Sequence, residues 1–169
     1  DSDTPPATTG QKASIDQILH AGWYLLELIN EILDLAVIES GKLSLSVEPV
    51  SLAEVMLECR AMVEPQAQQR GIGMTFPHFD IPPFVNADRT RVKQVLINLL
   101  SNAGKYTRRG AITLGAEVEL PYLHLWVRDT GPGVPFDLQA KIFEPFGIVG
   151  RKRRQEGIGL GLSITRHLV

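Results

Sequence analysis

The chain of 169 residues is poor in several features, and each shortage excludes a class of protein. Cys59 is its one cysteine, so it cannot form an internal disulfide, which is typical of a reducing compartment. Its formal net charge is −2, so no excess of positive charge attracts it to nucleic acid or to an anionic membrane. The most apolar stretch, residues 25–37, is interrupted by four polar or charged side chains and does not predict a membrane span. We also expect no signal peptide.

Length and composition predict one core of ordinary size with a protruding element, because 169 residues at 44% hydrophobic content fill about one domain. Residues 1–10 are small, polar and proline-containing, which indicates a linker or disordered leader. Ser14 and Gln17 have the spacing of a capping box, so we expect a helix to begin near Ser14. Gly41 stands where that helix is expected to end.

An apolar stripe follows this expected helix at three- and four-residue spacing, and further side chains widen it on one side. Its members are Ile15, Ile18, Leu19, Gly22, Leu25, Leu26, Ile29, Ile32, Leu33, Ala36 and Val37. So broad a face needs partners on more than one side. Two interpretations stay open: the helix lies on the core of its own domain, or it is one helix of a dimeric four-helix bundle.

Beyond Gly41 the apolar period changes repeatedly between two and about 3.6 residues. Strands are predicted over residues 43–47, 72–76, 111–120 and 122–128, the last two joined by a tight turn at Pro121. Helices are predicted over residues 51–69, 90–105, 136–143 and 160–169, with either Met62 or Val63 on the buried face of the first. This mixture predicts an α/β fold, a two-layer α/β sandwich whose mixed sheet carries helices on one face, preceded by the long helix.

Three polar side chains share one line of the helix expected over residues 90–105, beside its apolar arc. Asn98 and Asn102 are one turn apart, and Lys105 follows. An amide oxygen suits Mg²⁺, which bridges to nucleotide phosphates, and a lysine can hold a phosphate as a point charge. A solvated polar flank without any ligand is the alternative.

A carboxylate stands at the end of the last expected strand. The alternation over residues 123–127 carries Asp129 onto the apolar side, where a carboxylate needs hydrogen-bond donors. The exocyclic amine of adenine is such a donor, and Gly131 and Gly133 leave room for a ring to approach the backbone. A simple Asx turn is the alternative for this segment.

Three glycines, Gly157, Gly159 and Gly161, precede the last expected helix. Glycines at a helix start expose backbone N–H groups, and the helix dipole favours an anion there. The segment is not a Walker loop, because no Gly-x-x-x-x-Gly-Lys-Ser/Thr occurs, and its spacing does not fit the dinucleotide fingerprint. The basic run at residues 151–154 suits a lid over phosphates, and a solvated loop is the alternative.

Four segments in this order resemble the ATP-binding domain of sensor histidine kinases. Residues 98–106, 129–133, 143–146 and 157–162 are similar to the N box, the first glycine box, the F box and the second glycine box of that family. Residues 38–43 are similar to part of the second helix of its dimerisation and phosphotransfer hairpin. The resemblance implies that residues 11–41 are this second helix, and that residues 42–169 are the catalytic domain without its last strands.

The resemblance also implies roles for individual residues. It makes Asn102 the Mg²⁺ ligand with Asn98 assisting, and these two with Lys105 form the catalytic group. It places Lys105 and Tyr106 near the phosphates or ribose of ATP, and Asp129 on the adenine. The nucleotide pocket is implied to be completed by Gly131, Gly133, Phe146, Gly157, Gly159, Leu160 and Gly161.

Asn98 also distinguishes between branches of the wider superfamily. Topoisomerase, chaperone and mismatch-repair ATPases tend to carry a glutamate there, and an amide cannot accept a proton from water, so transfer to a side chain is favoured over hydrolysis. Three features depart from the family. None of His20, His78, His124 and His167 lies in a phosphoacceptor segment, Ile158 replaces the usual threonine, and the family continues with two more strands.

We therefore expect part of a sensor histidine kinase that binds ATP and Mg²⁺ and transfers the γ-phosphoryl group to a histidine on a separate helix. Expected partners are a second copy through the N-terminal helix and a response-regulator receiver domain, with no nucleic acid and no membrane contact by this segment. The expected location is the cytoplasm, whether or not the parent protein is anchored. Alone, the chain is not expected to phosphorylate itself. A dimerisation module that keeps the fold without turnover is the alternative.

Overall fold

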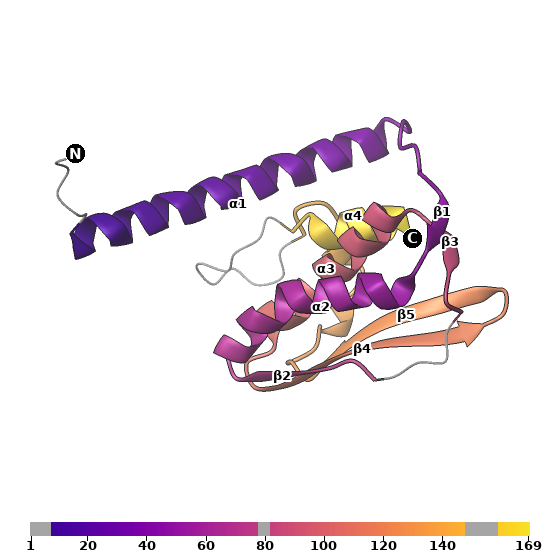
Figure 1. The fold of residues 1–169 in the computed structure, drawn as a ribbon. Helices are drawn as coiled ribbons and strands as arrows, with labels where there is room; N and C mark the ends of the chain where they lie inside the picture. The colour runs from indigo at the N-terminus through magenta and orange to yellow at the C-terminus, as the bar shows by residue number, and fades with distance from the viewer. Residues whose placement is uncertain (1–7, 78–81, 148–158) are drawn as a thin grey trace, which may run out of the picture.

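The computed structural model describes residues 8–77, 82–147 and 159–169, apart from the side chains of His20 and Glu27 (Figure 1). The helices are α1 (Thr9–Glu39), α2 (Leu52–Gln69), α3 (Arg89–Tyr106) and α4 (Gly161–Leu168). The strands are β1 (Glu48–Val50), β2 (Ile72–Thr75), β3 (Val85–Ala87), β4 (Gly110–Glu119) and β5 (Tyr122–Asp129), and two short 3₁₀ turns are η1 (Phe136–Leu138) and η2 (Lys141–Phe143). His78, residues 151–154, Gly157 and Ile158 lie outside the described residues.

The long helix begins earlier than its sequence predicts. Its N-cap is Thr8, whose hydroxyl accepts from the Gln11 N–H while the Gln11 side chain accepts from the Thr8 N–H. This capping box lies six residues before the expected one at Ser14, and the two have the same spacing of Ser or Thr and Gln. The predicted end is confirmed: Gly41 has a φ of 66° and closes a Schellman motif with the Ile38 carbonyl.

The sequence misplaces the strand β1 and does not predict the strand β3. Residues 43–47 alternate but form no strand, and the strand β1 begins at Glu48 instead. β1 pairs with β3 in antiparallel register, from Glu48 opposite Ala87 to Val50 opposite Val85. Alternation alone does not make a strand, because a strand also needs a neighbouring strand whose backbone N–H and C=O groups are free to pair with it. The 136–143 helix is likewise replaced by the two 3₁₀ turns η1 and η2.

The main sheet is mixed and carries helices on one face. Its order is β2-β4-β5, with β2 parallel and β5 antiparallel to the central strand β4. The helices α2 and α3 cover one face, with α4 beyond α3 (Figure 1). The predicted two-layer α/β fold is therefore confirmed, including the long helix that precedes it.

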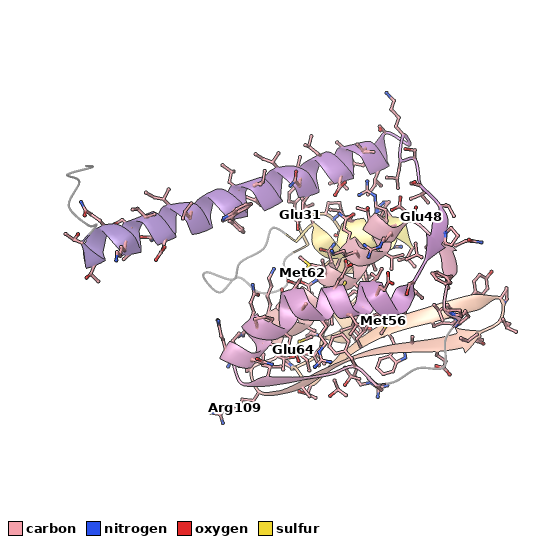
Figure 2. All side chains as sticks on the ribbon, viewed as in Figure 1. Glu31, Glu48, Met56, Met62, Glu64 and Arg109 are labelled. Atoms are coloured by element: carbon pink, nitrogen blue, oxygen red, sulfur yellow. The ribbon has the colours of Figure 1, made fainter. Side chains whose placement is uncertain are left out.

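The core lies between α2, α3 and the sheet. The buried side chains of α2 are Leu52, Val55, Met56, Cys59, Val63 and Ala67, and those of α3 are Leu96, Leu100 and Ala103. They pack on Ile72, Ile112 and Leu114 of the sheet. Val63, and not Met62, completes the buried face of α2, since Met62 is 54% exposed (Figure 2). This packing holds α3 in one position on the sheet, which matters because α3 carries the polar line predicted to bind a ligand.

The helix α1 contacts the rest of the molecule near its C-terminal end (Figure 1). Leu35 is 8% exposed and packs with Leu160 and Ile164 of α4, whereas Trp23 is 69% exposed. Most of the predicted apolar stripe is exposed, so the interpretation that the helix lies on its own domain's core is wrong for that stripe. No helix in the described part of the chain combines the length and apolar character needed to cross a membrane.

Candidate functional site

The polar line on α3 lies where the sequence predicts it. Asn98, Asn102 and Lys105 are all half-buried, next to the buried arc formed by Leu96, Leu100 and Ala103. The α3 helix is fixed at its start by Asp88, whose side chain accepts from the Arg91 N–H and from the Ser46 N–H. These backbone hydrogen bonds lower the pKa of Asp88. The three side chains therefore stand on a capped helix whose rotation is set by the core.

A second contact holds α3 against its neighbour α2. The Glu58 carboxylate of α2 accepts from Arg89 at 2.6 Å and from Lys93 at 2.9 Å. These two hydrogen bonds lower the pKa of Glu58 from its ordinary value of 4.5 to about 2. Neighbouring Cys59 is buried, and burial raises the pKa of its thiol to about 11, so it stays protonated. The pair of helices is thus tied by charge on its outer side and by apolar packing on its inner side.

Asn98 links α3 to the start of α4. Its amide Nδ2 donates to the Gly161 carbonyl oxygen at 3.2 Å. A Cβ at Gly161 would lie 3.4 Å from the Asn98 amide carbon, so a small residue suits this contact. The helix α4 has no side-chain cap, which leaves the N–H groups of its first turn without a side-chain partner. An uncapped helix start beside an amide fits a phosphate group.

Gly159 and Leu160 lead into this helix start. Gly159 has a φ of 80°, a conformation that favours glycine. The side chain of Leu160 is fully buried against Leu35 and Ile164, so it packs away from solvent and only its backbone could meet a nucleotide. Gly157, expected in the same loop, lies outside the described residues.

Asp129 stands at the end of β5, at the other end of α3. It pairs with Ile112 and lies on the same face as Val127, which confirms the predicted strand phase. Its side chain is nevertheless exposed, so the expected burial is wrong. The physical reason is position: Asp129 is the last residue of a strand at the sheet edge, where the cover from α3 has ended at Tyr106.

The Asp129 carboxylate is held through one of its two oxygens. Oδ1 accepts from the Gly131 N–H at 2.7 Å and from the Thr107 hydroxyl at 3.5 Å. Within the described part of the chain, no donor reaches Oδ2. A Cβ at Gly131 would lie 2.6 Å from Oδ1 and 3.3 Å from the Tyr106 carbonyl oxygen, so this position requires glycine. The Asx turn and the adenine contact are therefore compatible, because they use different oxygens.

A hollow opens beside this turn. It is lined by Arg108, Arg109, Thr130, Gly131 and Pro132. Arg109 projects from the turn between α3 and β4 into solvent (Figure 2). The Thr130 hydroxyl accepts from the Ala111 N–H and donates to the Arg109 carbonyl, which fixes the wall of the hollow. This hollow lies beside Gly131, the residue whose N–H donates to Oδ1 of Asp129.

The remaining predicted residues lie around these two contacts. Tyr106 is the last residue of α3 and is exposed, and Gly133 has a φ of 70° with open space around it. Phe146 is 60% exposed and has a φ of 61°, which is rare for a residue with a side chain and is typical of functional sites. Gly147 after it packs against the Lys141 carbonyl, where a side chain would clash.

The C-terminal half of α3 carries the candidate residues and both of their contacts with other elements. From Asn98 to Tyr106 the helix rises about 12 Å at 1.5 Å per residue. In the middle of the helix Asn98 contacts α4, and at its C-terminal end the Tyr106 backbone meets Gly131. The described residues hold no cluster of His, Cys, Asp and Glu suited to a metal.

Sequence reasoning missed two groups of residues. Thr107, the C-cap of α3, contacts Asp129 although it follows the motif and carries no charge. Asp34 of α1 accepts from Arg91 at 2.9 Å and from Gln94 at 2.6 Å, one turn before Asn98. Thr107 directly follows Tyr106, and this position could have identified it as a site residue. The contacts of Asp34 could not be predicted, because they join elements that lie far apart in the sequence.

Comparisons with known proteins give the family of this chain. Residues 87–169 match the family described as histidine kinase-, DNA gyrase B- and HSP90-like ATPase. A sensor-like histidine kinase of Rhizobium meliloti is 37% identical over 161 residues, which cover 94% of this chain and 31% of that protein. The chain therefore spans about a third of the length of this relative.

Solved structures give the same result. Full-length ShkA in complex with AMPPNP superimposes with a TM-score of 0.82 at 31% identity, over 97% of this chain and 34% of ShkA. The nucleotide-free catalytic domain of the histidine kinase ThkA gives a TM-score of 0.64 at 35% identity, over 73% of this chain and 80% of that domain. ThkA in complex with the response regulator protein TrrA gives 0.64 at 30% identity, over 86% of this chain and 42% of ThkA. This chain belongs to the sensor histidine kinase family and contains its ATP-binding catalytic domain.

Proposed function

We propose that this chain binds ATP with Mg²⁺ along α3 and, in the intact protein, presents the γ-phosphoryl group to a histidine on a separate helix. The observation that carries the proposal is the pair of contacts made by the C-terminal half of α3, where Asn98 in the middle of the helix meets the uncapped start of α4 and the C-cap Thr107 meets Asp129. We call Asp129, Gly131 and Thr107 the adenine end of the site. We call Asn98, Asn102, Lys105 and Gly161 its phosphate end.

The adenine end recognises the base by hydrogen bonding. Oδ2 of Asp129 is available to accept from the exocyclic amine of adenine, since Oδ1 is already used by Gly131 and Thr107. Guanine carries a carbonyl oxygen in place of that amine, and an acceptor facing a carboxylate is repelled. The hollow lined by Arg108, Gly131 and Pro132 lies next to this turn, where a ring would need room.

The phosphate end holds the charged tail. The amide oxygens of Asn102 and Asn98 would ligate Mg²⁺, which neutralises charge on the phosphates when bound. Lys105 and the N–H groups at the start of α4 would hold phosphate oxygens. Catalysis then consists of positioning, because none of these groups is a base that could activate water. The transfer to a histidine is favoured over hydrolysis for the same reason.

Two partners follow from the family. The exposed apolar stripe of α1, which includes Ile18, Leu25 and Ile29, suits packing against helices of a second copy. The complex of ThkA with a response regulator supports the proposal that the phosphoryl group passes from the histidine to a receiver domain. We place both steps in the intact protein, since this chain spans about a third of its relative's length.

Transfer in trans tests the activity. The chain is incubated with γ-labelled ATP, Mg²⁺ and a separately made helical hairpin that carries the acceptor histidine of a sensor kinase. We expect label on the hairpin that is stable in base and lost in acid, as a phosphohistidine is, and no label with Asn102→Ala. Ser101→Ala on the same helix serves as the control and is expected to retain transfer. Nucleotide binding without any label on the hairpin would support the non-catalytic alternative, and release of free phosphate would indicate an ATPase.

A further inference from the structure

The described residues contain a buried hydroxyl at the adenine end whose effect on the choice of base the proposed function leaves open. Three polar side chains among them are buried, Thr107, Ser163 and Thr165. The hydroxyls of Ser163 and Thr165 have no hydrogen-bond partner. Thr107 is fully buried, and its hydroxyl donates to Oδ1 of Asp129 at 3.5 Å. A buried hydroxyl aimed at an exposed carboxylate indicates a role for Thr107 at that carboxylate.

The backbone of the helix end fixes the position of Thr107. It is the C-cap of α3, and its N–H donates to the Ala103 carbonyl at 3.0 Å. The residue therefore cannot shift without unwinding the end of the helix that carries Asn98 and Asn102. Its hydroxyl joins the end of α3 to the end of β5, the two elements that bring the adenine end and the phosphate end together.

Two donors on one oxygen orient the carboxylate. With the Gly131 N–H alone, the Asp129 carboxylate could rotate about a single hydrogen bond and present either oxygen. The Thr107 hydroxyl adds a second donor to Oδ1, so Oδ2 is left without a donor from the described residues. The distance of 3.5 Å is long for such a bond, and contacts of this kind in ligand-free sites tighten when the ligand binds.

We propose that Thr107 is a positioning residue for adenine recognition, which acts by holding Oδ1 of Asp129 so that Oδ2 accepts from the 6-amino group of the base. The proposal rests on the proposed function, because it needs Asp129 to bind adenine. It extends that function by naming the residue that makes the site selective for a 6-amino purine. Such a residue affects the choice of base and leaves the phosphate end unchanged.

The test compares ADP with IDP, whose bases differ by a 6-amino group and a 6-oxo group. Binding of each with Mg²⁺ is measured by calorimetry for the wild-type chain and for Thr107→Val, Thr107→Ser and Thr165→Val. We expect Thr107→Val to bind ADP on the order of threefold to tenfold more weakly, with IDP binding unchanged. Thr107→Ser restores the preference because it keeps the hydroxyl, and Thr165→Val has no effect because its hydroxyl has no partner.

Further variants keep the outcome decisive. If Thr107→Val does not fold, Thr107→Cys and Thr107→Ser replace it, since they differ in hydrogen-bond donor strength and little in shape. In an Asp129→Ala background, Thr107→Val is expected to change the ratio of ADP to IDP affinity no further. Equal weakening of ADP and IDP, or no change in either, overturns the role of Thr107. Failure of the wild-type chain to bind ADP at all overturns the proposed function instead, so the two failures are distinguishable.

Discussion

The two ends of the proposed nucleotide site differ in how far the protein organises them. At the adenine end, the groups are bonded to one another: Asp129 accepts from Gly131 two residues away and from Thr107. At the phosphate end, within the described part of the chain, the side chains of Asn102 and Lys105 have no hydrogen bond or ion pair. Asn98 is held by one contact with Gly161, which lies far away in sequence.

This difference indicates that the base site is formed in advance and that the phosphate site is completed by its ligand. Preformed groups cost little entropy on binding, whereas free side chains lose rotamer freedom when they take hold of a phosphate or a metal. Variants at the adenine end should therefore weaken nucleotide binding equally with and without Mg²⁺. Variants at the phosphate end should weaken it when Mg²⁺ is present.

Asn102→Ala is expected to have the largest effect of the variants that separate the two ends. It removes the amide oxygen proposed to ligate Mg²⁺, so the affinity for AMPPNP with Mg²⁺ should fall about 100-fold, or about 2.7 kcal/mol. Without Mg²⁺ the wild type and the variant should bind with nearly equal affinity. Calorimetry with and without Mg²⁺ measures this, and Ser101→Ala on the same helix is the control. Equal losses in both conditions would contradict the assignment of Asn102 to the metal.

Gly131→Ala should disturb the adenine end alone. Its Cβ would lie 2.6 Å from Oδ1 of Asp129, so the carboxylate must move and nucleotide affinity should fall about tenfold. The loss should be the same with and without Mg²⁺. Gly104→Ala is the matched control, because nothing lies within 4 Å of its added Cβ. It should leave binding unchanged and raise the melting temperature slightly, as alanine favours a helix. A loss that depends on Mg²⁺ would show that the two ends are not separable in this way.

Asp34→Ala tests whether α1 supports the phosphate end. Asp34 holds Arg91 and Gln94 of α3, one turn before Asn98, in a half-buried ion pair. Its removal should lower the free energy of unfolding by about 1 kcal/mol, as measured by urea denaturation. Asp16→Ala, at an exposed position on the same helix, is the control. We expect the preference for ADP over IDP to stay unchanged. A loss of that preference would mean that α1 reaches the adenine end too.

Glu58→Gln is expected to have the smallest effect on nucleotide binding, since Glu58 ties α2 to the first turns of α3 through Arg89 and Lys93, before the residues of the proposed site. The folded pKa is about 2, below the ordinary value of 4.5, so the Glu58 carboxylate stabilises the fold above pH 4.5. That stability is lost as the pH falls from about 4.5 to about 2. Urea denaturation over this range should show a weaker pH dependence for Glu58→Gln than for the wild type. The same slope in both proteins would show that Glu58 is not the group responsible.

The sequence predicts the parts of this molecule that are set by local periodicity. The bounds of α3, the polar line from Asn98 to Lys105 and the strand phase of Asp129 all depend on neighbours in the chain, and the structure confirms them. The strand predicted over residues 43–47 does not form, because a strand needs a partner, and β1 pairs with β3 instead. The predicted burial of Asp129 is wrong, because its exposure depends on where the cover from α3 ends.

The contacts between distant elements were beyond sequence reasoning. Leu35 lies outside the predicted apolar stripe, yet it is the residue of α1 that is buried, against Leu160. The choice of Leu35 depends on the docking angle of α1, which no local pattern determines. The contact of Thr107 with Asp129 likewise depends on how the end of α3 meets the end of β5.

The central claim is that one nucleotide is held along the C-terminal half of α3, from Asn98 to the contact of Thr107 with Asp129, and Asp129→Ala tests it most directly. Calorimetric titration with AMPPNP and Mg²⁺ should give affinity roughly 30-fold weaker than the wild type, because a charged hydrogen bond to the base is lost while the phosphate contacts remain. The remaining binding should still depend on Mg²⁺. An affinity equal to that of the wild type would contradict the account, since the nucleotide would then not reach the end of β5.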